Sequence, residues 1–330
     1  MKIIVDGMGG DNAPLAVLQG CAQAVVEYGV EIVITGKKAE IEQLMEENQI
    51  SRQNISLVDA PTVLTMEDDP ISIVKDKKES SMGVALEMLK NGEGDAMLSA
   101  GNTGALLTGA TLIVKRINGV KRAALAPVLP NKEGLVMLID SGATIDCRPE
   151  FLEQYGIMGS VYMKNMYNIA KPRIGLANNG SEDCKGTELY TSSNKLLREN
   201  KNINFIGNVE GRGLMLGECD VYVADGFTGN LILKTVEGTS LFFLDFMKKL
   251  FGKSIISKLA AALVMKDIKA FKKKSDYKEI GGAALLGISK PVIKAHGSSD
   301  ARAIKNAINQ AKIFASSNII EEITDNIKQR

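Results

Sequence analysis

Apolar and amphipathic segments alternate along the first third of the chain. Short apolar runs, typical of buried strands, are separated by stretches in which apolar residues recur with a helical period. The pattern predicts strands at residues 3–5, 31–35, 55–58 and 96–98, and helices at 14–28, 37–46, 70–77, 82–89 and 103–115. Strands that alternate with helices favour a parallel sheet covered by helices.

The second half of the chain modifies this pattern. Residues 123–128 and 135–139 flank the turn sequence LPNKEG and predict a hairpin, so the sheet should be mixed. Further strands are predicted at 174–177, 203–206 and 221–224, and helices at 151–165, from Thr187 onward, at 299–315 and at 319–327. No repeat or linker is visible. We therefore predict one α/β domain over residues 1–330, with a mixed, mostly parallel sheet in a three-layer αβα arrangement.

One segment, at about residues 237–278, is expected to leave this domain as a protruding pair of helices. Residues 241–251 and 254–265 form two apolar helical patterns separated by Gly252. Between Lys248 and Lys274 there are nine lysines and one acidic residue, Asp267. The pattern predicts contact with an anionic membrane surface or an acidic protein partner; the alternative is a dimer interface or core helix pair with solvated lysines. The expected contact residues are Leu250, Phe251, Lys253, Ile255, Lys258, Leu259, Lys272, Lys273 and Lys274.

The overall composition excludes several functions. The chain is 45% hydrophobic and 24% charged, its net charge is +1, and it has no tryptophan, so a nucleic-acid surface is not expected. Its four cysteines form no CxxC pair and it has one histidine, so no metal site is predicted. The sequence begins directly with a strand pattern and has no apolar run long enough to cross a membrane. We expect a cytoplasmic protein.

Four predicted strands are followed by segments rich in glycine and small polar residues. These segments are DGMGGDNAP at residues 6–14, SAGNTG at 99–104, ANNGSEDCKGTE at 177–188 and DGFTGN at 225–230. Since α/β sheets bind ligands beyond the carboxyl ends of their strands, the repetition predicts that four loops meet at one sheet edge. The alternative is that the glycines only permit tight turns. None of the segments completes a GxGxxG or P-loop motif.

Two of the candidate residues are placed near predicted helix starts. Lys185 precedes a helix, where backbone N–H groups and the helix dipole favour an anion, but the same loop could be a turn capped by Thr187. His296 precedes the helix at 299–315, and could instead be a turn residue beside a capping Ser298 or Ser299. A thiolate nucleophile at Cys184 is disfavoured because no histidine is near in sequence.

Taken together, these ordered motifs, with NVEGR at residues 208–212 and HGSS at 296–299, resemble the bacterial phosphate acyltransferase family of phospholipid synthesis. The resemblance spans essentially the whole chain. It implies a fold similar to isocitrate dehydrogenases and phosphotransacetylases, a homodimer, and peripheral membrane association. The implied reaction transfers a fatty acyl group from acyl carrier protein to inorganic phosphate, without a cofactor, and a membrane-bound downstream acyltransferase is a further possible partner.

On this basis we expect phosphate to attack the thioester carbonyl directly. Lys185 and Asn179 are expected to bind phosphate or stabilise the oxyanion, Asp225 to accept a proton or orient a neighbour, and His296 to protonate the leaving thiolate. The expected binding residues are Asp6, Gly9, Gly10, Ser99, Asn102, Thr103, Gly186, Thr187, Thr228, Gly229 and Asn230. Two alternatives remain: an NAD-dependent dehydrogenase on the related fold, and a non-catalytic membrane or carrier-protein scaffold.

Overall fold

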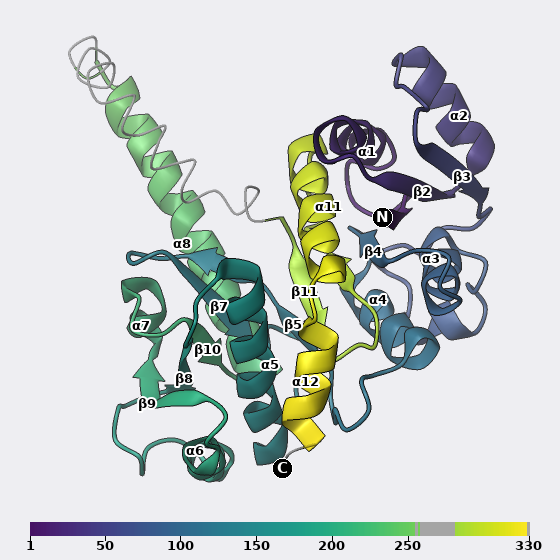
Figure 1. Cartoon of the computed structure of the whole chain (residues 1–330). Coiled ribbons are helices and arrows are strands. Elements are labelled where there is room, and N and C mark those ends of the chain that lie inside the picture. The colour runs from purple at the N-terminus through teal and green to yellow at the C-terminus, as the bar shows by residue number, and fades with distance from the viewer. Residues whose placement is uncertain (255–256, 258–280, 329–330) are drawn as a thin grey trace.

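A computed structural model describes residues 1–254, 257 and 281–328 (Figure 1). Its larger sheet has seven strands in the order β3-β2-β1-β4-β12-β11-β5. The strands pair in parallel except β11, which is antiparallel to both of its neighbours. Their bounds are β1 Lys2–Asp6, β2 Glu31–Gly36, β3 Ile55–Asp59, β4 Ala96–Ser99, β5 Ala124–Ala126, β11 Ala283–Leu286 and β12 Val292–Lys294.

A second sheet has five strands in the order β6-β7-β10-β8-β9. Only β6 is antiparallel to its neighbour. The bounds are β6 Val128–Pro130, β7 Leu135–Ile139, β8 Arg173–Asn178, β9 Asn204–Glu210 and β10 Val221–Val223. Class α/β with mostly parallel strands is confirmed, but the prediction of a single sheet was wrong.

The division between the sheets falls at Pro127. The sequence predicted one strand over residues 123–128, whereas the structure has β5 in the large sheet and β6 in the small one. Proline has no N–H to donate to a sheet ladder, so a change of partner at this residue costs no hydrogen bond. The predicted hairpin is confirmed for β6 and β7, which pair antiparallel.

Most helices agree with the sequence pattern within a few residues. The exceptions are 70–77, which shortens to the 3₁₀ turn η1, and 103–115, which ends as the π-helical turn η2. In addition, the helix at 211–216 was not predicted, and the helix at 226–252 starts well before its predicted position. The helices are α1 Leu15–Tyr28, α2 Lys38–Glu47, η1 Pro70–Val74, α3 Ser81–Lys90, α4 Thr103–Gly109, η2 Ala110–Val114, α5 Pro149–Tyr167, α6 Glu188–Glu199, α7 Gly211–Leu216, α8 Gly226–Gly252, α11 Ala301–Ser316 and α12 Ile319–Lys328.

Alternation of side chains along the strands gives each sheet two covered faces. In β1, Ile3 and Val5 join a core with α1 and α11, while Ile4 joins a core with α3 and α4. In β7, Met137 packs in the first of these cores, toward α5, and Leu138 packs toward α8. Because the first core includes residues of both sheets, they share one continuous apolar layer.

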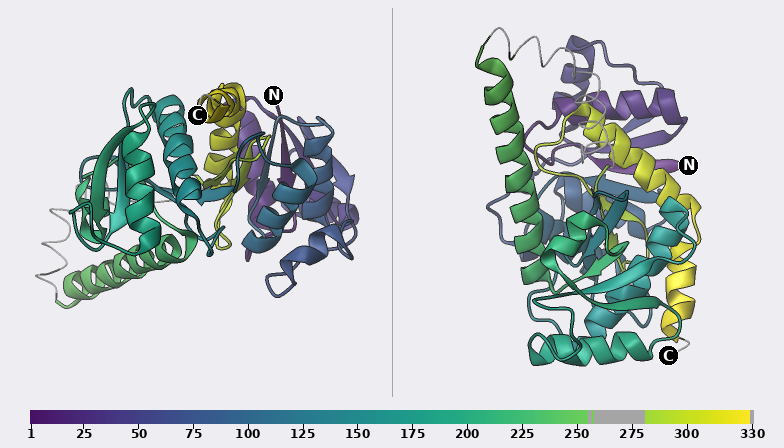
Figure 2. Two further views of the ribbon diagram at one scale, coloured as in Figure 1. Left: turned by 90° about the horizontal axis from the view of Figure 1, so that it is seen from below. Right: turned by 90° about the vertical axis from the view of Figure 1, so that its left-hand side faces the viewer.

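Helix α8 projects from the body as a long rod (Figure 2). It starts at Gly226, not near residue 237 or 241 as predicted, so Thr228, Gly229 and Asn230 lie in a helix rather than a loop. The reason is the Asp225 side chain, which caps the helix by accepting the N–H of Thr228.

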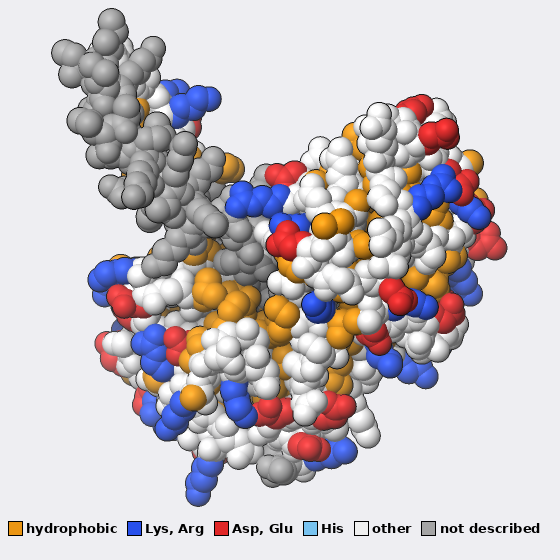
Figure 3. Space-filling view, turned by 45° about the horizontal axis from the view of Figure 1, so that its top comes forward, with side chains coloured by type: hydrophobic (Ala, Val, Ile, Leu, Met, Phe, Trp, Pro, Cys, Tyr) orange, Lys and Arg blue, Asp and Glu red, His pale blue; other side chains and the backbone are white. Residues whose placement is uncertain are grey.

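Beyond its first turns the helix is largely exposed. Leu241 and Phe242 are 68% and 71% exposed, and Figure 3 shows hydrophobic side chains on the surface beside the projecting segment. Leu250 and Lys253 are exposed at its end, with Phe251 half-buried. The other predicted contact residues, Ile255, Lys258, Leu259, Lys272, Lys273 and Lys274, lie outside the described residues. Within the part that the structure describes, no helix is both long and apolar enough to span a membrane.

Candidate active site

Three polar residues lie side by side at the carboxyl edge of the large sheet. They are Asp6 at the end of β1, Ser99 at the end of β4 and Lys294 at the end of β12, and all are buried. Ser99 is the register partner of Lys294, and its hydroxyl donates to Asp6 Oδ2 at 2.7 Å. The predicted residues Asp6 and Ser99 therefore meet, and the structure adds a lysine that the sequence analysis did not select.

Burial perturbs both charged members of this row. It lowers the pKa of the Lys294 ammonium to about 8, although the Asp6 and Asp11 carboxylates act in the opposite direction. Burial likewise raises the pKa of Asp6, against the effect of hydrogen bonds from Ser81 and Ser99. The available sequence signal for Lys294 was its position directly after the apolar pair Val292-Ile293, at the head of the segment that contains His296.

Three loops interlock above this row. The N–H of Asp11 donates to the carbonyl of Gly297 at 2.8 Å, and the amide of Asn12 donates to the carbonyls of Ser298 and Ser299. Gly9 is required for space, because a Cβ there would lie 2.6 Å from both Asp6 Oδ2 and the nitrogen of Gly101. The predicted residues Gly9, Gly10, Ser99 and His296 are thus in loops that pack on one another.

His296 links this edge to helix α8. Its Nδ1 accepts the N–H of Ser298 at 3.2 Å, so the neutral tautomer that fits this contact carries its proton on Nε2. Burial lowers its pKa, the Glu237 carboxylate opposes this, and the ammonium groups of Lys234 and Lys294 add to it. Lys234 and Glu237 belong to α8, which therefore faces the large-sheet edge.

A second cluster is located at the carboxyl edge of the small sheet. Asp225 accepts hydrogen bonds from Thr228 Oγ1 at 2.6 Å and from the hydroxyl of Tyr190 at 2.5 Å. Burial opposes ionisation of Asp225, but these hydrogen bonds outweigh it and hold its pKa below the ordinary value. Asp225 is therefore an ionised anchor of α8. Tyr190, which α6 contributes, had no recognisable signal in the sequence.

Beneath the start of α8 lies a buried carboxylate, Asp140, that the sequence analysis also missed. It accepts the N–H groups of Leu125, Ala143 and Thr144. Burial nevertheless raises its pKa to about 6. The start of α8 lies directly against this residue, because a Cβ at Gly226 would be 2.7 Å from Asp140 Oδ2 and one at Gly229 would overlap the Asp140 carbonyl.

The loop after β8 contains the remaining predicted catalytic residues, Asn179 and Lys185, and both are exposed. Within the described part of the chain, Lys185 forms no ion pair. Gly186 has a φ of 94° and packs against the side chain of Asn178, which donates to the carbonyl of Lys185. Thr187 occupies the N-cap position of α6 without a side-chain capping bond, so the loop is ordered by Asn178 instead.

Asn102 has a different environment from the one predicted. Its Oδ1 accepts the N–H of Ala105 and its Nδ2 donates to the carbonyls of Thr65, Met66 and Asp68. These bonds use both ends of the amide, so Asn102 caps α4 and secures the preceding loop. Thr103 is exposed as the first residue of α4.

The prediction that four loops meet at one edge of one sheet was wrong. The loops after β1 and β4 belong to the large sheet, and those after β8 and β10 belong to the small one. Helix α8 connects the two edges, since it begins at Asp225 and carries Lys234 and Glu237 toward His296.

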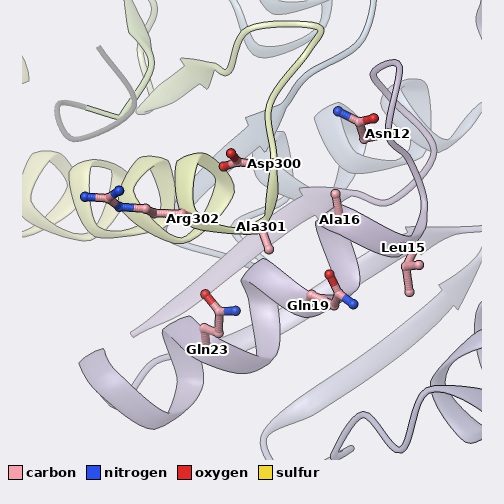
Figure 4. Close-up of a pocket in the computed structure, with 8 residues that line it drawn as sticks. All are labelled: Asn12, Leu15, Ala16, Gln19, Gln23, Asp300, Ala301 and Arg302. Carbon is pink, nitrogen blue, oxygen red and sulfur yellow. The ribbon is translucent and has the colours of Figure 1, made fainter. Parts of the chain in front are cut away.

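A cavity of about 550 Å³ lies behind the interlocked loops, between α1 and α11 (Figure 4). Its lining residues are Asn12, Leu15, Ala16, Gln19, Gln23, Asp300, Ala301 and Arg302. None of the predicted catalytic residues lines it, although Asn12 belongs both to its lining and to the interlocked loops. Across residues 1–254 and 281–328, no group of three or more His, Cys, Asp or Glu side chains is arranged to hold a metal ion.

Several solved structures share this fold at low sequence identity. A phosphotransacetylase from Streptococcus pyogenes has a TM-score of 0.64 at 17% identity, with 96% of this chain and 94% of that chain covered. A branched-chain phosphotransacylase from Enterococcus faecalis V583 has a TM-score of 0.56 at 12% identity, with 95% and 99% covered. The fold is shared by a 4-hydroxythreonine-4-phosphate dehydrogenase from Salmonella typhimurium. That comparison has a TM-score of 0.54 at 14% identity and covers 95% of this chain and 98% of the dehydrogenase. The fold alone therefore does not choose between transferase and dehydrogenase.

Sequence comparison makes that choice. The family model described as "Fatty acid synthesis protein" matches residues 1–322. The phosphate acyltransferase of Clostridium novyi (strain NT) is 46% identical over 331 residues, covering 100% of this chain and 99% of the relative. That of Thermoanaerobacterium thermosaccharolyticum is 45% identical, covering 99% and 97%. The chain belongs to the phosphate acyltransferase family and is a transferase of fatty acid synthesis. The resemblance and the enzyme class predicted from the motifs are confirmed.

Proposed function

We propose that this enzyme transfers a long-chain fatty acyl group from the thioester of acyl carrier protein to inorganic phosphate. The products are acyl phosphate, which feeds phosphatidic acid synthesis, and the free carrier thiol. The observation that carries the proposal is the buried Lys294 ammonium at a sheet edge where α1 and α11 also begin. A buried cation beside helix N-termini favours an anion such as phosphate.

In the proposed reaction, an oxygen of hydrogen phosphate forms a bond to the thioester carbonyl carbon, and the carbon–sulfur bond then breaks. The phosphate proton ends on the carrier thiol, so atoms and charge balance without a cofactor. Lys185 and Asn179 bind phosphate or stabilise the oxyanion, and Thr228 and Asn230 contribute from the start of α8. The bound groups lie between the two sheet edges, which act as one catalytic unit.

Two roles follow from the local contacts. Asp225 has a lowered pKa and accepts three hydrogen bonds, so its proposed role is to orient Thr228 and Tyr190 rather than to take a proton. His296 has a lowered pKa and carries its proton on Nε2 in the neutral form. It can therefore donate a hydrogen bond from Nε2–H to the departing sulfur and stabilise the thiolate, which then takes up the phosphate proton.

The test is to incubate the protein with long-chain acyl-acyl carrier protein in EDTA, with and without phosphate. Free thiol is measured, and acyl phosphate is trapped with hydroxylamine. Phosphate-dependent formation of both products is expected in equal amounts. Thiol release without phosphate would indicate a thioesterase, and no release with any added metal or with acyl-CoA would refute the proposal. A nicotinamide-dependent absorbance change would favour the dehydrogenase alternative.

We propose that the enzyme is a homodimer that uses α8 as part of its interface. Leu241, Phe242, Phe243 and Phe246 are at least half exposed in the isolated chain, although such side chains normally find an apolar partner. Light scattering on the intact protein should give twice the chain mass, and Phe242→Glu should reduce it. A wild-type protein that remains monomeric at micromolar concentration would contradict this proposal.

Peripheral membrane association of a cytoplasmic enzyme is the last part of the proposal. Its support is Lys248, Lys249 and Lys253, exposed at the end of α8, together with the lysines that follow in the sequence. Flotation with vesicles that contain anionic lipid should recover the protein, whereas neutral vesicles should not. Binding to acyl carrier protein or to a membrane-bound acyltransferase without any vesicle binding would instead indicate a protein partner.

A further inference from the structure

Lys294 is the buried lysine of the candidate site, and the proposed reaction as written above gives it no individual step. Its side chain is 7% exposed. An ammonium group has three N–H donors, and here two backbone carbonyls, those of Ala100 and Ala295, accept from it. Ala100 follows β4, whereas Ala295 immediately precedes His296. One side chain therefore connects two loops of the site.

The burial of this charge requires compensation. Moving an ammonium out of water costs several kcal/mol unless charges and hydrogen bonds replace its hydration. The Asp6 carboxylate and the two carbonyls supply this compensation. An apolar residue could fill the same space at no such cost, so the presence of a charged lysine at the sheet edge points to a role in the site.

We propose that Lys294 is a positioning residue for acyl transfer, because its ammonium holds the carbonyls of Ala100 and Ala295 and thereby fixes His296 above the phosphate-binding edge. This inference rests on the proposed function. Lys294 acts through the backbone beside His296 and through its charge, without contact to the acyl group.

The charge of Lys294 has a measurable effect on His296. The charged groups that face the imidazole are Glu237 and Lys234 from α8, Asp11 from the first loop, and Lys294 from β12. Burial is the largest cause of the lowered pKa of His296, and the two lysines add to it. Removing the Lys294 charge, or loosening the loop that it holds, should raise that pKa.

The experiment uses Lys294→Met, which keeps an unbranched side chain one atom shorter than lysine and removes its charge. His296 is the only histidine in the chain, so one imidazole signal in an NMR titration reports its pKa without ambiguity. The matched control is Lys312→Met, since Lys312 also donates to a backbone carbonyl, that of Tyr28 at 2.9 Å, but near the carboxyl end of α11. Phosphate-dependent acyl transfer and thermal unfolding are measured for each variant.

We expect Lys294→Met to raise the pKa of His296 and to lower kcat/KM for phosphate roughly 100-fold, the cost of a misplacement near 1 Å. Lys312→Met should change neither quantity. A folded Lys294→Met protein with the wild-type His296 titration and turnover would overturn the inference. If wild type itself shows no phosphate-dependent transfer, the proposed function fails, and the NMR titration still tests the link between Lys294 and His296.

A second variant addresses loss of folding. Asp6→Asn/Lys294→Met removes both buried charges, while the asparagine Oδ1 can still accept from Ser99. This protein should fold, show the altered His296 titration and remain impaired in phosphate use. Wild-type kinetics in the double variant, or failure of both variants to fold, would make Lys294 a purely structural residue and overturn the proposal.

Discussion

Replacing Gly9 with alanine tests whether the interlocked loops form the catalytic site. The added Cβ would lie 2.6 Å from Asp6 Oδ2 and from the nitrogen of Gly101, where ordinary contacts begin at 3.4 Å. The first loop must therefore move by about 0.8 Å, or the bonds from Ser99 to Asp6 at 2.7 Å and from Gly101 to Ser99 at 3.0 Å must break. Overpacking of this kind costs about 1–3 kcal/mol, and a displacement near 1 Å costs roughly 100-fold in rate.

The assay is acyl phosphate formation trapped with hydroxylamine, measured beside urea unfolding. Gly238→Ala is the matched control, because it makes the same change within α8 at a position with no heavy atom within 4 Å of the added Cβ. The control should keep full activity and gain about 0.5–1 kcal/mol from its higher helix propensity. Turnover of Gly9→Ala within twofold of wild type, in a folded protein, would refute the assignment of the first loop to the site.

Three further predictions concern the small-sheet cluster and its loop. Lys185→Ala should lower turnover roughly 100-fold or more while changing the free energy of unfolding by less than about 0.5 kcal/mol. The small effect on stability is expected because the side chain is exposed and forms no ion pair within the described residues. Near-normal turnover would show that Lys185 is not part of the site. Asp225→Asn should cost about 1–3 kcal/mol in urea unfolding, since hydrogen bonds from Thr228 and Tyr190 lose a charged acceptor; an unchanged midpoint would contradict this. The folded-state pKa of Asp140, about 6, lies above its ordinary 3.8, so the folded state binds more protons between those pH values. As pH rises through this window, the free energy of unfolding of the wild type should therefore fall by up to about 3 kcal/mol relative to that of Asp140→Asn. A difference in unfolding free energy between the two proteins that does not change with pH would argue against the burial effect.

The apolar runs of two well-predicted strands, β1 and β4, are buried on both faces. The ends of these strands correctly placed Asp6 and Ser99 at candidate loops. Strands β11 and β12 were missed because they are short and close to Gly281, Gly282 and Gly287. Their stability comes from long-range pairing with β4 and β5, which a local pattern does not contain.

The site residues likewise divide into those that a local sequence pattern can predict and those that only the three-dimensional fold brings together. The sequence identified Asp225 and Thr228 together because both belong to the polar segment DGFTGN that follows the predicted strand at 221–224. Tyr190 reaches the site only through helix packing, so spacing in the sequence could not select it, whereas Asp140 and Lys294 directly follow apolar runs and were overlooked. Asn102 was selected as a ligand because Asn suits both binding and capping, and only the structure separates these roles.

The place of β11 and β12 within the large sheet also constrains how the molecule is made. All five strands of the small sheet lie within residues 128–223, so this sheet can form while the polypeptide is still being synthesised. The large sheet cannot be completed until residues 283–294 are synthesised, because these residues form the two strands between β4 and β5. Before that point, β4 and β5 each expose an unpaired edge. A polypeptide that stops before Ala283 would have a complete small sheet beside a large sheet with a gap, and should aggregate or be degraded. Lys294 and His296 belong to the same late segment, so the proposed roles of these residues predict that an unfinished product would also lack acyltransferase activity.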